Sequence, residues 1–141
     1  MYGRDKIDTY KKLDVGTADK GKLVVMLYEG VVKFLNIAAE NMNFATYDVV
    51  NENIQKASDI IDELRLALDF KAGGEIAQKL ESIYVYILGR LQTANIEKSK
   101  TIVLEVKSYL EEMLESWKIA AKTNTASNSS GLNRGGFSLN G

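Results

Sequence analysis

The sequence predicts an all-α protein folded as an antiparallel up-down four-helix bundle, with a flexible N-terminal segment and a disordered C-terminal tail. Apolar residues recur at steps of three and four along four long stretches, and no stretch sustains the period of two that a strand requires. The short connections between these stretches favour antiparallel packing of neighbouring helices. We therefore divide the chain into an N-terminal segment 1–18, a bundle 19–122 and a tail 123–141, whose Ser, Asn and Gly content is typical of disorder.

The first helix is predicted from Asp19 to about Asn43. Asp19 is an N-cap candidate and Thr17 is the competing one, because both side chains carry an oxygen that can accept a backbone N–H. The polar residues of this stretch fall on one narrow stripe, whereas an ordinary surface helix has only one apolar face. We therefore expect this helix to be central in the fold or covered by another segment.

The other three helices are predicted over residues 47–70, 75–95 and 100–122, and Ser99 is the N-cap candidate of the last one. The residues that we expect to face the core are Val50, Ile54, Ala57, Ile61, Leu64 and Leu68, then Ile76, Leu80, Ile83, Ile87, Leu91 and Ala94, then Val103, Val106, Leu110, Met113, Trp117 and Ala120. A second apolar line lies beside the first and consists of Ile60, Ala67, Tyr84 and Leu88. Such a surplus of apolar helix surface often marks a site for a partner helix or peptide.

Two adjacent glycines, Gly73 and Gly74, stand between the second and third helices. A phosphate-binding loop would follow a strand, whereas here a helix precedes the glycines and the acidic Glu75 follows them. A single kinked helix across them would be too long to pack in a domain of this size. We therefore predict a helical hairpin in which one of the glycines adopts the left-handed conformation and Glu75 lies in the first turn of the next helix.

The composition argues against an enzyme. The chain has no histidine and no cysteine, so it lacks the commonest general base, the commonest transition-metal ligand and any thiol chemistry. The adjacent carboxylates Asp62 and Glu63, and likewise Glu111 and Glu112, do not face each other on a helix, and we interpret them as solvated charges. We predict a non-catalytic protein with no cofactor, no metal and no small-molecule substrate.

Charge and hydropathy narrow the possible partners and the location. The net charge of −1 does not indicate a nucleic-acid-binding surface. The chain has no run of about 18 apolar residues, so we expect no membrane insertion, and its first residues lack the apolar stretch of a secretory signal. The absence of cysteine fits a cytoplasmic protein.

Several separated stretches resemble a known family. They contain Met26-Leu27-Tyr28-Glu29-Gly30, Ile60-Ile61-Asp62-Glu63-Leu64 and Gly73-Gly74-Glu75-Ile76-Ala77, and a last stretch ends at Trp117. In this order and spacing the chain resembles the FliS family, the flagellin-specific export chaperones, from residue 10 to about residue 122. The resemblance does not extend to the tail.

The resemblance implies a cytoplasmic protein that binds the C-terminal region of newly made flagellin, prevents premature polymerisation and supports type III export. Components of the flagellar export gate are a second class of partner that it implies. In the family, the N-terminal segment near the first tyrosine of the motif is implicated in covering apolar surface, and Tyr10 is the matching position here. We therefore predict that residues 1–18 act as a removable cover.

The second apolar lines are where we place the partner. The candidate binding residues are Ile60, Leu64, Ala67, Tyr84 and Leu88, together with Tyr10 of the cover. Tyr86 and Tyr109 flank the core-facing lines, where an amphipathic ring can either pack or meet a partner. The alternative is a non-catalytic regulatory or scaffold bundle that self-associates through the same surface, without affinity for flagellin.

Overall fold

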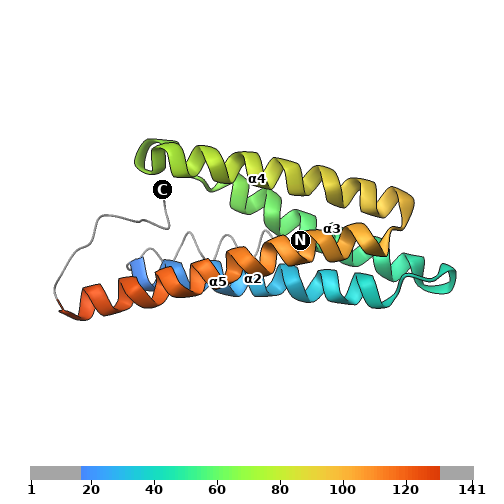
Figure 1. Cartoon of the computed structure of the whole chain (residues 1–141), viewed down its shortest axis with the longest axis horizontal. Helices are drawn as coiled ribbons and strands as arrows, with labels where there is room; N and C mark the ends of the chain where they lie inside the picture. The colour runs from blue at the N-terminus through green and yellow to red at the C-terminus, as the bar shows by residue number, and fades with distance from the viewer. Residues whose placement is uncertain (1–16, 131–141) are drawn as a thin grey trace.

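The computed structural model describes the backbone of residues 17–130 and the side chains of residues 20–123. Its elements are α2 (Thr17–Glu40), the 3-10 helix η1 (Phe44–Thr46), α3 (Tyr47–Leu66), α4 (Phe70–Glu97) and α5 (Lys100–Ser130). The part of the chain described here contains no strand, and its four long helices run antiparallel to their neighbours (Figure 1). The predicted all-α four-helix bundle is confirmed.

The helices pack in a ring in the order of the chain. α2 packs against α3 and α5, and α4 also packs against α3 and α5, so α2 and α4 lie diagonally across the bundle. In Figure 1, α2 and α5 run side by side along the long axis, and α4 lies above them. α3 rises from the level of α2 toward the start of α4. The largest fully buried side chains come from all four helices: Tyr28, Val31, Leu35, Val50, Ile60, Ile61, Ile87, Leu91, Val103, Val106 and Leu110.

The second helix ends earlier than predicted, at Leu66 rather than near Phe70. The cause is Asp69, whose carboxylate oxygen accepts hydrogen bonds from the backbone N–H groups of Lys71 and Ala72 at 3.0 Å each. This is an N-cap, which begins a new helix at Phe70 before the glycines are reached. The connection between α3 and the main part of α4 therefore begins before the predicted turn, at Ala67, and ends at Gly74, within the predicted turn.

One of the two glycines has the positive φ expected of it: at Gly74 φ is 50°, but ψ is −124°, which is not the left-handed helical conformation that was predicted. This residue interrupts α4, so that the single turn beginning at Phe70 is separated by a kink from the main helix that follows Gly74. A residue with a Cβ atom would be strained at this φ. The backbone conformation of Gly74 thus sets the direction of the main part of α4 relative to the turn that begins at Phe70.

The last helix begins as predicted and continues beyond its predicted end. The Ser99 hydroxyl accepts a hydrogen bond from the backbone N–H of Ile102 at 3.1 Å, which confirms Ser99 as the N-cap. α5 then extends to Ser130, past the predicted end at Lys122. Adding a residue to an existing helix is easier than starting one, and the sequence has no glycine or proline before Gly131 to stop it.

Candidate partner-binding groove

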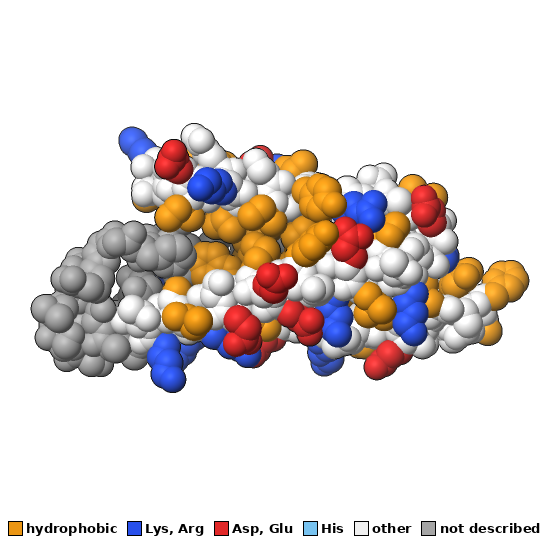
Figure 2. All heavy atoms as spheres, viewed as in Figure 1, with side chains coloured by type: hydrophobic (Ala, Val, Ile, Leu, Met, Phe, Trp, Pro, Cys, Tyr) orange, Lys and Arg blue, Asp and Glu red, His pale blue; other side chains and the backbone are white. Residues whose placement is uncertain are grey.

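An apolar groove runs between α4 and α5 and consists of two adjoining hollows. The larger, of about 420 Å³, is lined by Ser82, Ile83, Tyr86, Ile87, Tyr109, Glu112 and Met113. The smaller, of about 210 Å³, is lined by Ile76, Leu80, Ile83, Met113, Ser116 and Trp117. Because both hollows share Ile83 and Met113, they form one continuous surface, which we call the α4–α5 groove. Figure 2 shows hydrophobic side chains gathered between α4 and α5.

One wall of the groove is an apolar line on α4. Ile76 is 37% exposed, Ile83 is 39% exposed and Tyr86 is 52% exposed, although all three have large apolar side chains. Leaving apolar surface in water costs about 25 cal/mol per Å², so a contiguous line of this kind is typical of a binding surface. The opposite wall is formed by Tyr109, Met113 and Trp117 of α5.

The prediction that Ile76 and Ile83 face the core is wrong. The rest of the predicted line is confirmed, since Ile87, Leu91 and Ala94 are buried and Leu80 is partly buried against the core. Near the start of α4 the core takes Ala77 and Tyr84 instead, because adjacent apolar residues can both fit a helical repeat and the pattern does not say which one turns inward. Ile76 and Ile83 are therefore exposed in the groove.

The structure does not bring the predicted binding residues together on one surface. Ile60, Leu64 and Tyr84 are buried in the core, and Leu88 is partly buried against it. Ala67, at the C-cap of α3, is partly exposed but lines neither hollow. Tyr86 lines the larger hollow, whereas Tyr10 lies outside the described residues. A partner could reach Ile60, Leu64 or Tyr84 only if the helices moved.

A polar network supports the Tyr109 side of the groove. The Tyr109 hydroxyl donates a hydrogen bond to Glu105 Oε2 at 2.7 Å, and Arg90 Nη2 donates to Glu105 Oε1 at 2.8 Å. Hydrogen bonds from Arg90 and then Tyr109 lower the pKa of Glu105, and the bond to Glu105 raises the pKa of Tyr109 to about 12. The rings of Tyr86 and Tyr109 are 6.3 Å apart, so the network positions an aromatic pair at the groove.

Beneath the smaller hollow lies an aromatic cluster that joins three helices. Trp117 of α5 lines the hollow and packs against Tyr28 of α2, with ring centroids 6.1 Å apart. The Tyr28 hydroxyl is 2.6 Å from the Tyr84 hydroxyl of α4. Burial raises the pKa of Tyr28 to about 12. The side chains at the base of the groove are therefore fixed by the core itself.

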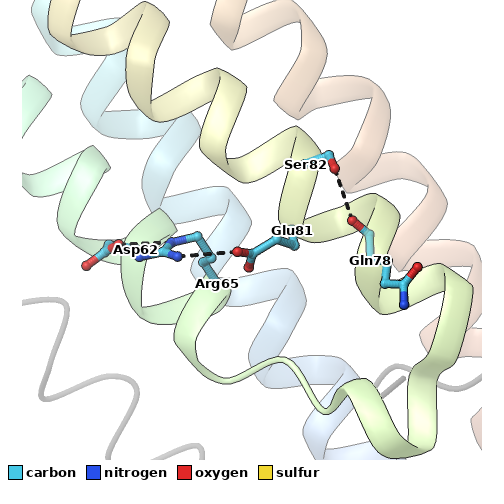
Figure 3. Close-up of polar contacts among 5 residues, drawn as sticks. All are labelled: Asp62, Arg65, Gln78, Glu81 and Ser82. Carbon is cyan, nitrogen blue, oxygen red and sulfur yellow. Dashed lines mark hydrogen bonds and ion pairs between the residues drawn. The ribbon is translucent and has the colours of Figure 1, made fainter.

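On the α3 side, one ion pair joins α4 to its neighbour. Arg65 of α3 lies 3.1 Å from Asp62 in its own helix and 3.5 Å from Glu81 of α4 (Figure 3). The hydrogen bond that Arg65 donates to Asp62 is the main reason that the pKa of Arg65 is raised. Glu63 is only 4% exposed, so the prediction that it is a solvated charge is wrong; it faces the packed side of α3. Glu111 and Glu112 are exposed, as predicted.

The described side chains contain no group of three or more acidic residues placed to hold a metal ion. None of the helices described is both long and apolar enough to span a bilayer. What the site offers is an apolar groove with aromatic rings and one carboxylate, which suits the binding of a peptide or helix.

The chain is similar to known proteins over most of its length. The family model for "Flagellar protein FliS" matches residues 3–124. The flagellar secretion chaperone FliS of Bacillus subtilis is 33% identical over 114 residues, which cover 81% of this chain and 84% of that protein. The protein of the same name from Salmonella typhimurium is 32% identical over 123 residues, covering 84% and 91%. The chain therefore belongs to the FliS family.

Proposed function

We propose that this protein is a cytoplasmic export chaperone that binds the C-terminal segment of flagellin, prevents its premature polymerisation and keeps it competent for type III export. Membership in the FliS family supports an export-chaperone role, because the relatives are named flagellar secretion chaperones. The observation that carries the binding half of the proposal is the exposed apolar lining of the α4–α5 groove. Components of the export gate are a second class of partner in this proposal.

A groove of this kind suits a segment that folds when it binds. Such a segment loses conformational entropy on ordering, so a broad apolar contact must offset that loss. The α4 wall extends from Ile76 to Tyr86, which corresponds to about 15 Å of helix. An amphipathic helix can lay its apolar face along this length. A flagellin segment docked in this way could no longer use the same apolar face for assembly.

Calorimetric titration with a C-terminal fragment of flagellin tests the proposal directly. We expect a one-to-one complex, and we expect Ile83→Asp to weaken it at least about tenfold, because the variant places a charge in the apolar contact. Val85→Asp is the matched control, since Val85 is 51% exposed on the same helix but lines neither hollow. Wild-type protein that does not bind the fragment would refute the proposal.

Self-association through the same groove is the competing function. Light scattering of the protein alone and with the fragment separates the two. Suppose that the wild type forms a stable oligomer that does not bind the fragment, and that the Ile83→Asp variant is monomeric. This result would favour a self-associating scaffold or regulatory protein.

We also propose that residues 1–18, including Tyr10, cover apolar surface in the free chaperone. Residues 1–16 of this segment lie outside the described residues, and residues 17 and 18 are the first two of α2. Deleting it should raise the affinity for the flagellin fragment or increase the fluorescence of a dye that binds apolar surface. If the deletion changed neither the affinity nor the fluorescence, the proposal that residues 1–18 cover apolar surface would be wrong.

A further inference from the structure

We propose that Glu112 pairs with a Lys or Arg residue of the segment bound in the α4–α5 groove and thereby helps to select that segment. The inference rests on the proposed function and adds a chemical requirement to it. Glu112 lines the larger hollow and is the one carboxylate among the residues that line the groove, and none of those residues is Lys or Arg. The lining of the groove therefore carries one negative charge and no positive charge, and the nearby Arg90 is paired with Glu105.

The neighbouring carboxylates of α5 differ from Glu112 in having cations of their own. Glu105 pairs with Arg90 at 2.8 Å, Glu111 with Lys107 at 3.7 Å and Glu115 with Lys118 at 3.4 Å. Glu112 forms no ion pair with any residue whose side chain is described. The residues one turn before and after it are Ser108 and Ser116, which carry no charge.

Docking of a segment would remove water from one side of this carboxylate. A partly desolvated charge without a partner is unfavourable, whereas a cation supplied by the segment compensates for the lost hydration. A segment with a neutral or acidic residue at that point is therefore disfavoured. Selection of this kind acts mainly by penalising the wrong partner.

The spacing of the two hollows indicates where that cation stands. On α5 the larger hollow is lined from Tyr109 to Met113 and the smaller from Met113 to Trp117, a shift of one helical turn. Four residues of helix span about 6 Å, which matches the distance between side chains at i and i+4 of a bound helix. We infer a helix with two large apolar residues one turn apart and a basic residue beside the one that occupies the larger hollow.

The test measures the affinity of a flagellin C-terminal fragment for wild type, Glu112→Gln and Glu112→Lys. We expect Glu112→Gln to weaken binding by about two- to fivefold, the range that an exposed ion pair supplies, and Glu112→Lys to weaken it further. The difference from wild type should shrink in high salt, because salt screens charges near the surface. Glu111→Gln is the matched control and should bind as wild type does, since Glu111 lies outside the groove.

A charge exchange identifies the partner residue. Each Lys and Arg of the fragment is replaced by Gln, and the replacement at the pairing position should make binding insensitive to Glu112→Gln. Glu at that position should restore binding to Glu112→Lys. If the fragment bound wild type and both Glu112 variants equally well, this inference would fail while the proposed function stood. Failure of wild type to bind would overturn both, and an effect on self-association alone would assign the groove to a second copy of the chain.

Discussion

The hydroxyl groups of Tyr28 and Tyr84 lie 2.6 Å apart in the centre of the bundle, and together they join two helices whose backbones are not adjacent. Both side chains are almost completely buried. Each hydroxyl is therefore removed from water, and the other hydroxyl satisfies it. The hydrogen bond spans the diagonal between α2 and α4, so it links the helix that forms one wall of the groove to the opposite side of the core.

Removal of one of these hydroxyls should destabilise the fold. Tyr84→Phe leaves the Tyr28 hydroxyl buried without this partner, which should lower the free energy of unfolding by about 1–3 kcal/mol. The double variant Tyr28→Phe/Tyr84→Phe removes both groups and should lose less than the sum of the single losses. Urea denaturation of the wild type and the three variants measures this coupling. Strictly additive losses would show that the two hydroxyls do not interact.

The raised pKa of Tyr28 predicts a loss of stability at high pH. Its ordinary value of 10.0 applies to the unfolded chain and its value in the fold is about 12. The contribution to stability is complete below pH 10 and is lost as the pH rises toward 12, because only the unfolded chain releases the proton there. The expected slope is about −1.4 kcal/mol per pH unit from this one residue.

The comparison of wild type with Tyr28→Phe between pH 9 and 11 isolates that contribution, since the lysines and other tyrosines titrate in both proteins. The variant should lose stability less steeply as the pH rises. Parallel curves would mean that Tyr28 ionises in the fold as it does in the unfolded chain.

The positions of the helices could be predicted from the sequence because each carries a long apolar repeat, but their ends depend on single side chains. Ser99 is recognisable as an N-cap because it directly precedes the repeat of α5. Asp69 is harder to recognise because it stands inside the apolar pattern, before the glycines that look like the natural boundary. A local hydrogen bond thus outweighs the periodicity that surrounds it.

The groove was less predictable than the fold because a helix with two apolar lines can turn either one inward. On α4 the predicted line is buried from Ile87 onward, and only before that residue does packing against α3 and α5 turn a neighbouring apolar residue inward instead. The core selects Tyr84 and leaves Ile83 exposed. Tyr86 lines the larger hollow, which fits its position beside the core-facing line because an amphipathic ring tolerates the edge of a groove.

Alanine substitutions at Gly74 and Gly89 of α4 should change the stability of the fold in opposite directions. Gly74→Ala forces a Cβ into a φ of 50°, which should cost about 1–2 kcal/mol of stability. Gly89 lies within the helix with open space where a Cβ would stand, so Gly89→Ala should stabilise by about 0.5–1 kcal/mol. Thermal denaturation of both variants checks the pair. A stabilising Gly74→Ala would be incompatible with the positive φ of this residue.

The network of Arg90, Glu105 and Tyr109 predicts how acid affects the groove. The pKa of Glu105 lies below its ordinary value of 4.5, chiefly because of the hydrogen bond from Arg90. The stability that Glu105 contributes is therefore present above pH 4.5 and is lost as the pH falls below that value toward the lower pKa of the folded state. Glu105→Gln should be less stable than wild type at pH 7, and the difference should narrow below pH 4.5.

Urea denaturation between pH 3.5 and 7 measures that difference, and Tyr109→Phe serves as the matched control. Tyr109→Phe keeps the ring at the groove and the ion pair with Arg90 but removes the hydroxyl that donates to Glu105. It should therefore retain most of the acid sensitivity that Glu105→Gln loses. A constant difference between wild type and Glu105→Gln across this range would show that Glu105 titrates normally in the fold, and that its bonds to Arg90 and Tyr109 do not hold the groove wall in solution.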